Sequence, residues 1–349
     1  MQSQPKARPQ ATDSSPVPIG IDDGYAVTKL ALADGRLLAI PSAARAGRSN
    51  VSWMPRAEQL IFEYETKGTV FSVGDVDASP TRFEGYSSSA LNRVIVQHAL
   101  QCADLEGREL AAVSGLPVNH FYHRSGKRRA TAISEKQANL VTPVTPLSAA
   151  SAAEIIAHDV VPEALAAWYD HVITVNDGRA SLDQERICRP LAVVDIGGRT
   201  TDTVVVANQG IEHSSSASVT LGCLDVQRSL ANSLEERFEL GSLGHRQLRG
   251  VLETGRIRLY GRDYDVSAEI DAARAEFSAR LHTEIKRQLG RGAELERIVM
   301  VGGGALALRK LIADWFPNQV TAPQPAFANA RGMLKYRRFV LSDDAAERV

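Results

Sequence analysis

The sequence predicts an α/β protein of two domains, and three observations support this prediction. At 349 residues the chain exceeds the usual size of a single domain. Apolar residues make up 44% of it, which is ample for hydrophobic cores. A strand-turn-strand pattern with a polar turn occurs near the N-terminus and again near the middle of the chain, and a strand followed by glycines comes later. We therefore expect two domains that each carry one polar turn.

Composition excludes several classes of function. Forty basic residues against forty-one acidic ones leave a net charge of -1, so whole-protein electrostatics do not favour nucleic acid or an anionic membrane. The chain has no uninterrupted apolar stretch of transmembrane length and no N-terminal signal core. Cys102, Cys188 and Cys223 are far apart and lack metal-ligand spacing, so we expect buried, reduced thiols in a cytoplasmic protein.

The first ordered segment is a strand meander with carboxylates in its first turn. Residues 1–17 are rich in Pro, Ser and Gln, which predicts a flexible tail. A strand then leads into Asp22-Asp23-Gly24-Tyr25-Ala26, and the next strand carries Lys29, whose ammonium group could reach back as a point charge for phosphate. The Asp34-Gly35 turn precedes a third strand. Alone, this pattern is weak.

The next segment, to about residue 170, mixes short strands with amphipathic helices. Ser89 is the expected cap of its first helix, and residues 122–129 form a basic loop, either solvated or an anion contact. Glu163, after Pro162, is expected in the first turn of a helix, where a glutamate usually offsets the helix dipole. The expected elements are strands at 61–64, 69–73 and 110–114, a helix at 88–103, and a helical pattern over 149–170 that is interrupted at 161–164.

The most informative stretch is the central hairpin over residues 191–206. Two β-branched, apolar runs flank a turn that carries Asp195, Gly197, Gly198, Thr200, Thr201 and Asp202. Glycine lets backbone N–H groups approach a phosphate, hydroxyls can donate to it, and a carboxylate at a strand end can hold the water shell of Mg²⁺. The stretch is typical of half a metal-nucleotide site, although an ordinary hairpin with a polar tip has the same pattern.

The remaining chain ends in a glycine turn that could cradle an anion. A buried strand at 297–301 leads into Gly302-Gly303-Gly304-Ala305 and an expected helix at 306–315, although a bare glycine turn would look the same. The other expected elements are a strand at 210–219, helices at 223–238, 243–254, 265–289 and 329–336, and a strand pair at 257–265.

The three turns in this order resemble the ATPase fold shared by actin, heat-shock chaperones and sugar kinases. The resemblance rests on Asp22-x-Gly24 with Lys29, on residues 195–202, and on residues 301–305. It implies an α/β, actin-like (ribonuclease H-like, duplicated) two-domain ATPase fold with the nucleotide in the interdomain cleft. The implied boundaries are a tail at 1–17, domain I at 18–188 completed by a C-terminal helix at 325–349, and domain II at 189–324.

Within that superfamily the chain is most similar to the ParM/StbA plasmid-segregation actin homologues. The similarity runs from Ile21-Asp22-Asp23-Gly24 through residues 115–118, the central hairpin and Leu221-Gly222 to residues 329–333. The chain departs from the pattern in its N-terminal tail and at Arg199, where the superfamily often has a small residue. Arg199 could contact either a phosphate or another subunit.

This resemblance implies a site and a mechanism. It implies an ATP hydrolase that binds ATP, or GTP, with Mg²⁺ held through water by Asp22 and Asp195, while Glu163 orients the attacking water. Glu163, Asp195 and Asp22 are the implied catalytic residues. The implied nucleotide-binding residues are Asp22, Gly24, Tyr25, Ala26, Lys29, Gly197, Gly198, Thr200, Gly222, Gly302, Gly303, Gly304 and Ala305.

The resemblance also implies filaments that move plasmid copies apart in the bacterial cytoplasm. The implied partners are further copies of the chain and a ParR-like DNA-binding adaptor, with centromere DNA reached only indirectly and no membrane. A small-molecule kinase of the same fold is an alternative, but no second catalytic carboxylate is evident. An ATP-binding scaffold of the FtsA or pilus-assembly type is another, but neither terminus has an amphipathic membrane helix.

Overall fold

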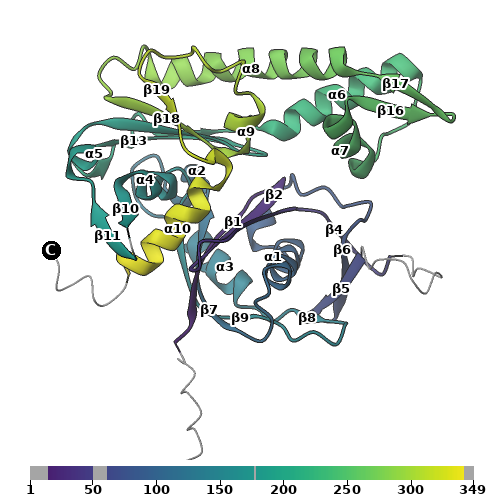
Figure 1. The fold of residues 1–349 in the computed structure, drawn as a ribbon, viewed down its shortest axis with the longest axis horizontal. Helices are drawn as coiled ribbons and strands as arrows, with labels where there is room; N and C mark the ends of the chain where they lie inside the picture. The colour runs from purple at the N-terminus through teal and green to yellow at the C-terminus, as the bar shows by residue number, and fades with distance from the viewer. Residues whose placement is uncertain (1–14, 50–60, 177, 342–349) are drawn as a thin grey trace, which may run out of the picture.

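Two sheets of the same topology form the molecule, as a computed structural model shows for residues 15–49, 61–176 and 178–341 (Figure 1). The first has the order β3-β2-β1-β7-β9 and the second the order β14-β13-β12-β18-β19, with β15 beside β13. In each sheet the first strand pairs antiparallel with the next strand and parallel with a much later one, β7 or β18. The fold is therefore the duplicated actin-like α/β fold that the motifs predict.

The first sheet is built from strands that alternate between two covered faces. Ile19 and Ile21 point to one face, where they pack with Val96 and Leu100 of a helix. Gly20 points to the other face, where an added Cβ would collide with the carbonyl of Ala330. The strands are β1 (Val17–Asp23), β2 (Val27–Leu32), β3 (Leu37–Pro41), β7 (Glu109–Leu116) and β9 (Glu154–Pro162), and the helices on the first face are α1 (Ala90–Cys102) and α3 (Ala130–Leu140).

A small sheet extends the first half and has its own aromatic core. Tyr64, Phe71 and Tyr86 are buried there, and the Tyr25 ring packs 5.0 Å from the Tyr86 ring. The elements are β4 (Ala44–Ala46), β5 (Ile61–Thr66), β6 (Thr69–Gly74), β8 (Thr145–Pro146) and the 3₁₀ turn η1 (Tyr86–Ser88). This extension faces the second half across the molecule (Figure 1).

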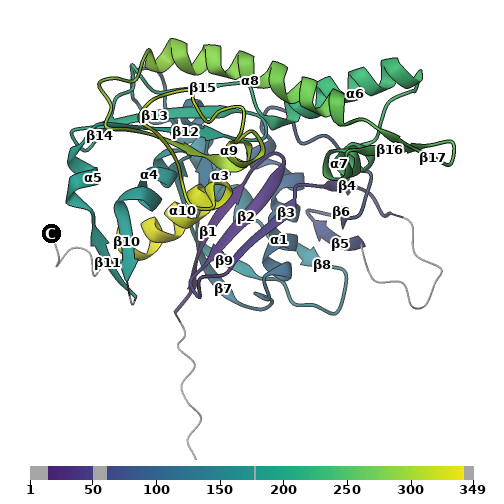
Figure 2. The ribbon, with the colours of Figure 1, turned by 45° about the horizontal axis from the view of Figure 1, so that its top comes forward.

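The second sheet carries a helix pair on its outer face. Val194 and Ile196 point toward these helices, where Leu230, Phe277 and Leu281 are buried. The strands are β12 (Leu191–Ile196), β13 (Thr201–Ala207), β14 (Gly210–Ile211), β15 (Ala217–Val219), β18 (Arg297–Val301) and β19 (Gln319–Thr321). The helices of this half are α6 (Cys223–Phe238), α7 (His245–Thr254), α8 (Ser267–Leu289) and α9 (Gly302–Ala307), with the ribbon β16 (Arg256–Leu259) and β17 (Arg262–Asp265) (Figure 2).

Two helices pass between the sheets and join the halves. α4 (Leu165–Val172) and α10 (Ala328–Phe339) pack closely, because Gly332 of α10 lies against the backbone of Ala166. α10 also packs on β1 and β7, so the end of the described chain completes the first half. The remaining elements are α2 (Val118–Phe121), β10 (Ile173–Asn176), β11 (Arg179–Leu182), α5 (Gln184–Cys188) and η2 (Pro325–Phe327).

Three secondary-structure predictions are wrong. Residues 154–162 form the strand β9 and not a helix, since they pair in parallel with β7; Pro162 ends this strand. The predicted strand at 210–219 is two short strands, β14 and β15, separated by a turn. The helix predicted at 306–315 starts at the glycines themselves and ends at Ala307.

The structure also bears on the termini and the thiols. The predicted tail lies mainly outside the described residues, as does the end of the helix predicted at 325–349, beyond residue 341. All three cysteines are free, but the prediction that they are buried is wrong for Cys102 and Cys188, which are exposed on their helices. None of the described helices has the length and hydropathy of a membrane span.

Candidate functional site

The first polar turn lies at the end of β1, and its residues are held from several sides. Asp22 is opposite Lys29 in the β1–β2 register, and the Lys29 Nζ is 2.8 Å from the Asp22 Oδ2. Ser42 donates to the carbonyl of Gly24 at 2.7 Å, and Thr81 donates to that of Tyr25 at 2.5 Å. The turn is thus fixed, and Lys29 is an ion-pair partner of Asp22 as well as the predicted phosphate ligand.

The second polar turn occupies the equivalent position in the second sheet. Asp195 is opposite Asp202 in the β12–β13 register, and the turn between them is closed by a bond from Gly197 N to Thr200 O at 2.9 Å. The Asp195 carboxylate is 5% exposed and accepts a hydrogen bond from Asn329 Nδ2 at 2.6 Å. An ion or ligand at this turn would therefore lie beside a buried Asp195 carboxylate that already accepts one hydrogen bond.

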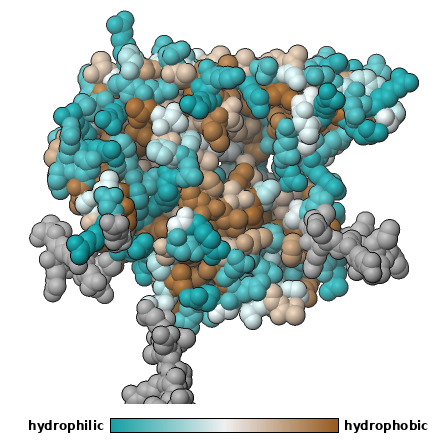
Figure 3. Space-filling view, viewed as in Figure 1, coloured by the Kyte–Doolittle hydropathy of each residue, from teal (hydrophilic) through white to brown (hydrophobic). Residues whose placement is uncertain are grey.

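The two turns face each other across the molecule. A Cβ added at Gly198 would lie 2.8 Å from the Ala26 Cβ and 3.0 Å from the Ala26 N. The guanidinium of Arg199 lies over the ring of Tyr25, with its Cζ 5.1 Å from the ring centroid, and donates to the carbonyl of Phe83. The space-filling view shows a hollow between the two halves of the molecule (Figure 3).

The glycine segment packs directly behind the second turn. Gly302 has a positive φ of 87°, and a Cβ there would collide with the Asp195 Oδ1. At Gly304 a Cβ would collide with Ile196 and lie 2.8 Å from the Cys223 Sγ, whereas at Gly303 no atom lies within 4 Å of the added Cβ. Gly302 and Gly304 are therefore required by packing, and Gly303 leaves open space. Because α9 spans only residues 302–307, the helix dipole expected there is small.

Gly222 acts through α6 and the second turn. A Cβ at Gly222 would collide with the carbonyl of Gly198. Cys223 N and Leu224 N, at the start of α6, donate to the carbonyls of Gly197 and Gly198 at 2.9 and 2.8 Å. These amides position the turn and are already used, so Gly222 supports the predicted phosphate loop from behind.

Glu163 lies at the junction of β9 and α4, and not inside a helical first turn. Its N–H donates to the carbonyl of Leu116 at 2.8 Å, and its Cγ packs where a Cβ of Gly115 would be, 2.7 Å away. Burial, followed by the charges of Asp202 and Asp22, raises the pKa of the Glu163 carboxyl well above its ordinary value. The neighbours that perturb it are the carboxylates of both polar turns, which brings the three predicted catalytic residues into one cluster.

Two residues outside the predicted site belong to this cluster. Asp202 accepts hydrogen bonds from Val118 N at 2.8 Å and Thr200 Oγ1 at 3.0 Å, and also from Ser218 Oγ. Asn329 donates to Asp195 and accepts from Ala164 N at 3.1 Å. The polar residues of the central turn indicate Asp202. Asn329 lies in the segment 329–333 noted in the sequence, but no local pattern predicts its contact with Asp195, which is far away in the sequence.

The charge balance of the cluster favours a bound cation. Burial, together with the charges of Asp22 and Asp202, raises the pKa of the Asp195 carboxyl to about 7. Lys29 is the cation in contact with Asp22. Within the described residues no group of three or more His, Cys, Asp or Glu side chains is arranged to hold a metal directly. The neighbouring carboxylates of Asp22 and Asp195, without a closed ligand shell, fit Mg²⁺, which usually keeps several of its waters.

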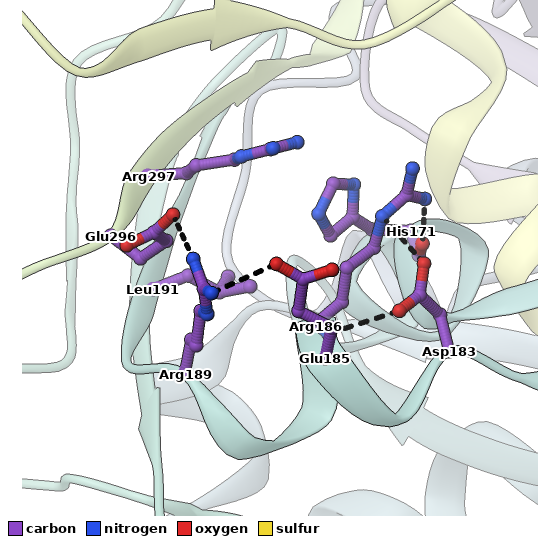
Figure 4. A pocket seen from close by; sticks show the side chains of 8 residues that line it. All are labelled: His171, Asp183, Glu185, Arg186, Arg189, Leu191, Glu296 and Arg297. Atoms are coloured by element: carbon purple, nitrogen blue, oxygen red, sulfur yellow. Dashed lines mark hydrogen bonds and ion pairs between the residues drawn. The ribbon is translucent and has the colours of Figure 1, made fainter.

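A pocket at the opposite end of β12 belongs to a different set of residues (Figure 4). It is lined by Leu191, at the start of that strand, and by the ion pairs of Arg189 with Glu185 and Glu296 and of Arg186 with Asp183. The charges of Arg186 and Arg189 are paired within the pocket, Arg297 also lines it, and Asp195 lies at the other end of the strand. This pocket is separate from the cluster described above.

The basic loop at 122–129 lies against the second half. Tyr122 packs on His213 with ring centroids 4.8 Å apart, and Gly126 also faces His213. Nearby, Asn119 Nδ2 donates to the carbonyl of Ser218 at 2.9 Å. The loop is therefore partly a contact between the two halves and not only a solvated segment.

Family models match both parts of the chain. Residues 17–173 match the N-terminal model of the plasmid segregation protein ParM. Residues 193–314 match the C-terminal model of the archaeal MreB-like actin homologue. A comparison with curated protein sequences finds no significant match.

Solved structures share the fold over nearly the whole chain. A non-polymerisable quadruple mutant of pCBH ParM is 18% identical with a TM-score of 0.74, covering 93% of this chain and 99% of that one. A 15-stranded ParM filament from Clostridium botulinum is 19% identical with a TM-score of 0.72, covering 92% and 99%. An archaeal actin homologue in complex with ADP is 20% identical with a TM-score of 0.69, covering 95% and 100%. The actin-like fold predicted from the sequence is confirmed, and the match of residues 17–173 to the ParM N-terminal model agrees with the predicted family.

Proposed function

We propose that this chain, a ParM-like protein of the actin superfamily, is an ATPase that assembles into filaments when nucleotide is bound and thereby segregates plasmids. The observation that carries the proposal is the meeting of two equivalent polar turns from two sheets of equal topology, with Gly198 against Ala26. A nucleotide whose phosphates lie between these turns would bridge the halves. Relatives with this fold include a filament and an ADP complex, which supports both parts of the proposal.

The chemistry follows from the cluster. The amides of residues 24–26 and 197–200, with Lys29, bind the phosphates. Asp22 and Asp195 would hold Mg²⁺ through its water shell, and the metal would supply charge neutralisation to the phosphates. Glu163 would orient the attacking water and accept its proton, and burial with the neighbouring carboxylates raises the pKa of its carboxyl, which makes the carboxylate a stronger base.

The proposed partners follow from assembly and charge. The first partner is another copy of the chain. A net charge of -1 gives no electrostatic footprint for DNA, so plasmid DNA is reached through a ParR-like adaptor that binds a centromere-like site. The proposed location is the cytoplasm of a plasmid-bearing bacterium, and GTP is a second candidate nucleotide.

Nucleotide-dependent assembly tests the proposal. Purified protein is sedimented and imaged by electron microscopy with Mg²⁺ alone, with ATP and Mg²⁺, and with GTP and Mg²⁺. We expect filaments only with a nucleoside triphosphate, and shorter-lived ones as hydrolysis proceeds. Protein that binds and hydrolyses ATP but stays monomeric at every concentration tested would favour a kinase or a scaffold instead.

A further inference from the structure

Residues 75–86, which we call the strap, run from the end of β6 to η1 along the edge of the candidate nucleotide site. The strap is fixed to the first half: Ser79 N donates to the carbonyl of Ala44 at 2.9 Å, and Thr81 Oγ1 donates to the carbonyl of Tyr25. The strap ends at Tyr86, whose buried ring packs on the Tyr25 ring. It is therefore attached directly to the first polar turn.

The strap also contacts the second half at three points along its length. Asp75 pairs with Arg246 of α7 at 2.8 Å. Arg82 pairs with Asp225 of α6 at 2.8 Å, and the side chain of this aspartate is 3% exposed. The carbonyl of Phe83 accepts the hydrogen bond from Arg199. Two ion pairs and one charged hydrogen bond thus cross between the halves from a single loop.

Two of these contacts end on groups that shape the second polar turn. Asp225 accepts from Gly222 N at 3.0 Å and so caps α6, whose first amides bind the carbonyls of Gly197 and Gly198. Arg199 belongs to the turn itself and lies on the ring of Tyr25. Any opening of the halves at this edge must therefore break contacts that also hold the two turns in place.

The strap lies on the edge away from the helices that join the halves. α4 and α10 cross between the sheets on one side of the β1–β2 hairpin, and α6 and α7 face the small sheet on the other side (Figure 1). Contacts at the joined side, such as Asn329 with Asp195, hold the hinge. Contacts of the strap join the halves on the other side of the β1–β2 hairpin.

We infer that the strap is a clasp that closes the nucleotide site and sets the rate at which nucleotide leaves it. The inference rests on the proposed nucleotide binding between the turns and adds a mechanism of exchange control. Arg199 of the second turn contacts Tyr25 of the first turn and the carbonyl of Phe83 in the strap. Polymer turnover would then depend on clasp opening, since a subunit must exchange its nucleotide before it reassembles.

The test measures release of a fluorescent ADP analogue after a chase with unlabelled ATP, in the full-length protein with Mg²⁺. Arg82→Ser removes the cross-half partner of the buried Asp225, which keeps its pairing with Arg228 of α6 at 3.0 Å, so release should accelerate about three- to tenfold. Arg246→Ser removes a more exposed pair and should accelerate release about two- to fivefold. Arg199→Ser should also accelerate release, by about three- to thirtyfold. Arg258→Ser is the matched control, because Arg258 pairs with Asp263 inside its own ribbon.

A charge swap across the Asp75–Arg246 pair distinguishes loss of this contact from loss of folding. Asp75→Arg alone should accelerate release, and Asp75→Arg combined with Arg246→Asp should restore it to near the wild-type rate. Small-angle scattering of nucleotide-free protein should show a larger radius of gyration for Arg82→Ser than for Arg258→Ser. Release rates within twofold of wild type in Arg82→Ser and Arg246→Ser, with unchanged scattering, would overturn the clasp. Wild-type protein that binds no nucleotide would overturn the proposed function itself, whatever the scattering shows.

Discussion

Replacing Glu163 by glutamine separates a catalytic role from a structural one. A glutamate that only offset the dipole of α4 would stabilise the fold, and its loss would cost about 0.3–1 kcal/mol. The structure predicts the opposite effect, a gain in the free energy of unfolding when Glu163 is replaced. Glu163 is raised in pKa by burial and by carboxylates of both polar turns, so its charge is a cost to the folded protein.

The magnitude and its pH dependence follow from that shift. The pKa of Glu163 in the folded protein lies above its unfolded value of about 4.5. The free energy of unfolding is therefore not reduced by this carboxyl below pH 4.5, and it decreases as the pH rises above that value. Each unit by which the folded protein raises this pKa lowers the free energy of unfolding by about 1.4 kcal/mol once the pH exceeds the folded-state pKa. Glu163→Gln should therefore unfold at higher urea than the wild type at pH 7, and the difference should shrink toward pH 4.5.

The chemical role is read from turnover. If Glu163 orients the attacking water, single-turnover hydrolysis of ATP by Glu163→Gln should fall roughly a hundredfold or more, with ATP affinity little changed. Filaments would still assemble with ATP and outlive wild-type filaments in a light-scattering assay. A variant that hydrolyses ATP at a near wild-type rate, or that is less stable by about the cost of a lost dipole partner, refutes this reasoning.

Three further perturbations test other parts of the account. Asp195→Ala should weaken the magnesium-dependent part of ATP affinity, measured by titration with and without Mg²⁺; an unchanged dependence would contradict the metal assignment. Gly302→Ala, at φ 87°, should lower the free energy of unfolding by about 2–4 kcal/mol, whereas Gly303→Ala should leave it unchanged or raise it by up to about 1 kcal/mol; equal effects would show that the packing behind Asp195 is soft. Burial lowers the pKa of His98 to about 4, below its unfolded value of about 6.5, so the free energy of unfolding should fall by about 2 kcal/mol between pH 7 and pH 5. Urea denaturation of His98→Asn over this range should show a weaker pH dependence than the wild type. An equal pH dependence would show that His98 does not cause this fall.

Local patterns were enough for the elements whose signals are local. The α6 prediction has the observed bounds, Cys223–Phe238, since Gly222 and the apolar spacing mark its start and face. The two polar hairpins were also predicted correctly, because β-branched runs flank their glycine turns. These hairpins also carried the fold class, as the repeated unit is the feature that both sheets share.

Elements that depend on distant partners were not predicted. The composition of β9 is typical of a helix, but its pairing with β7 makes it a strand. Local pattern could not predict this pairing, because β7 lies more than thirty residues earlier in the chain. The glycines at 302–304 are helical because β12 and α6 pack against them, which no local pattern encodes. Within the candidate site, Asn329 and the contact of Arg199 with Tyr25 join residues from opposite ends or halves of the chain.

The central claim is that the phosphates of a nucleotide lie between the two polar turns and join the halves. A structure of the protein with a non-hydrolysable ATP analogue and Mg²⁺, determined by crystallography or electron microscopy, tests it most directly. We predict phosphate density between residues 24–26 and 197–200, a hydrated metal beside Asp22 and Asp195, and a water within hydrogen-bond distance of Glu163. Phosphates bound elsewhere, or held by one half alone with the second turn empty, would contradict the account.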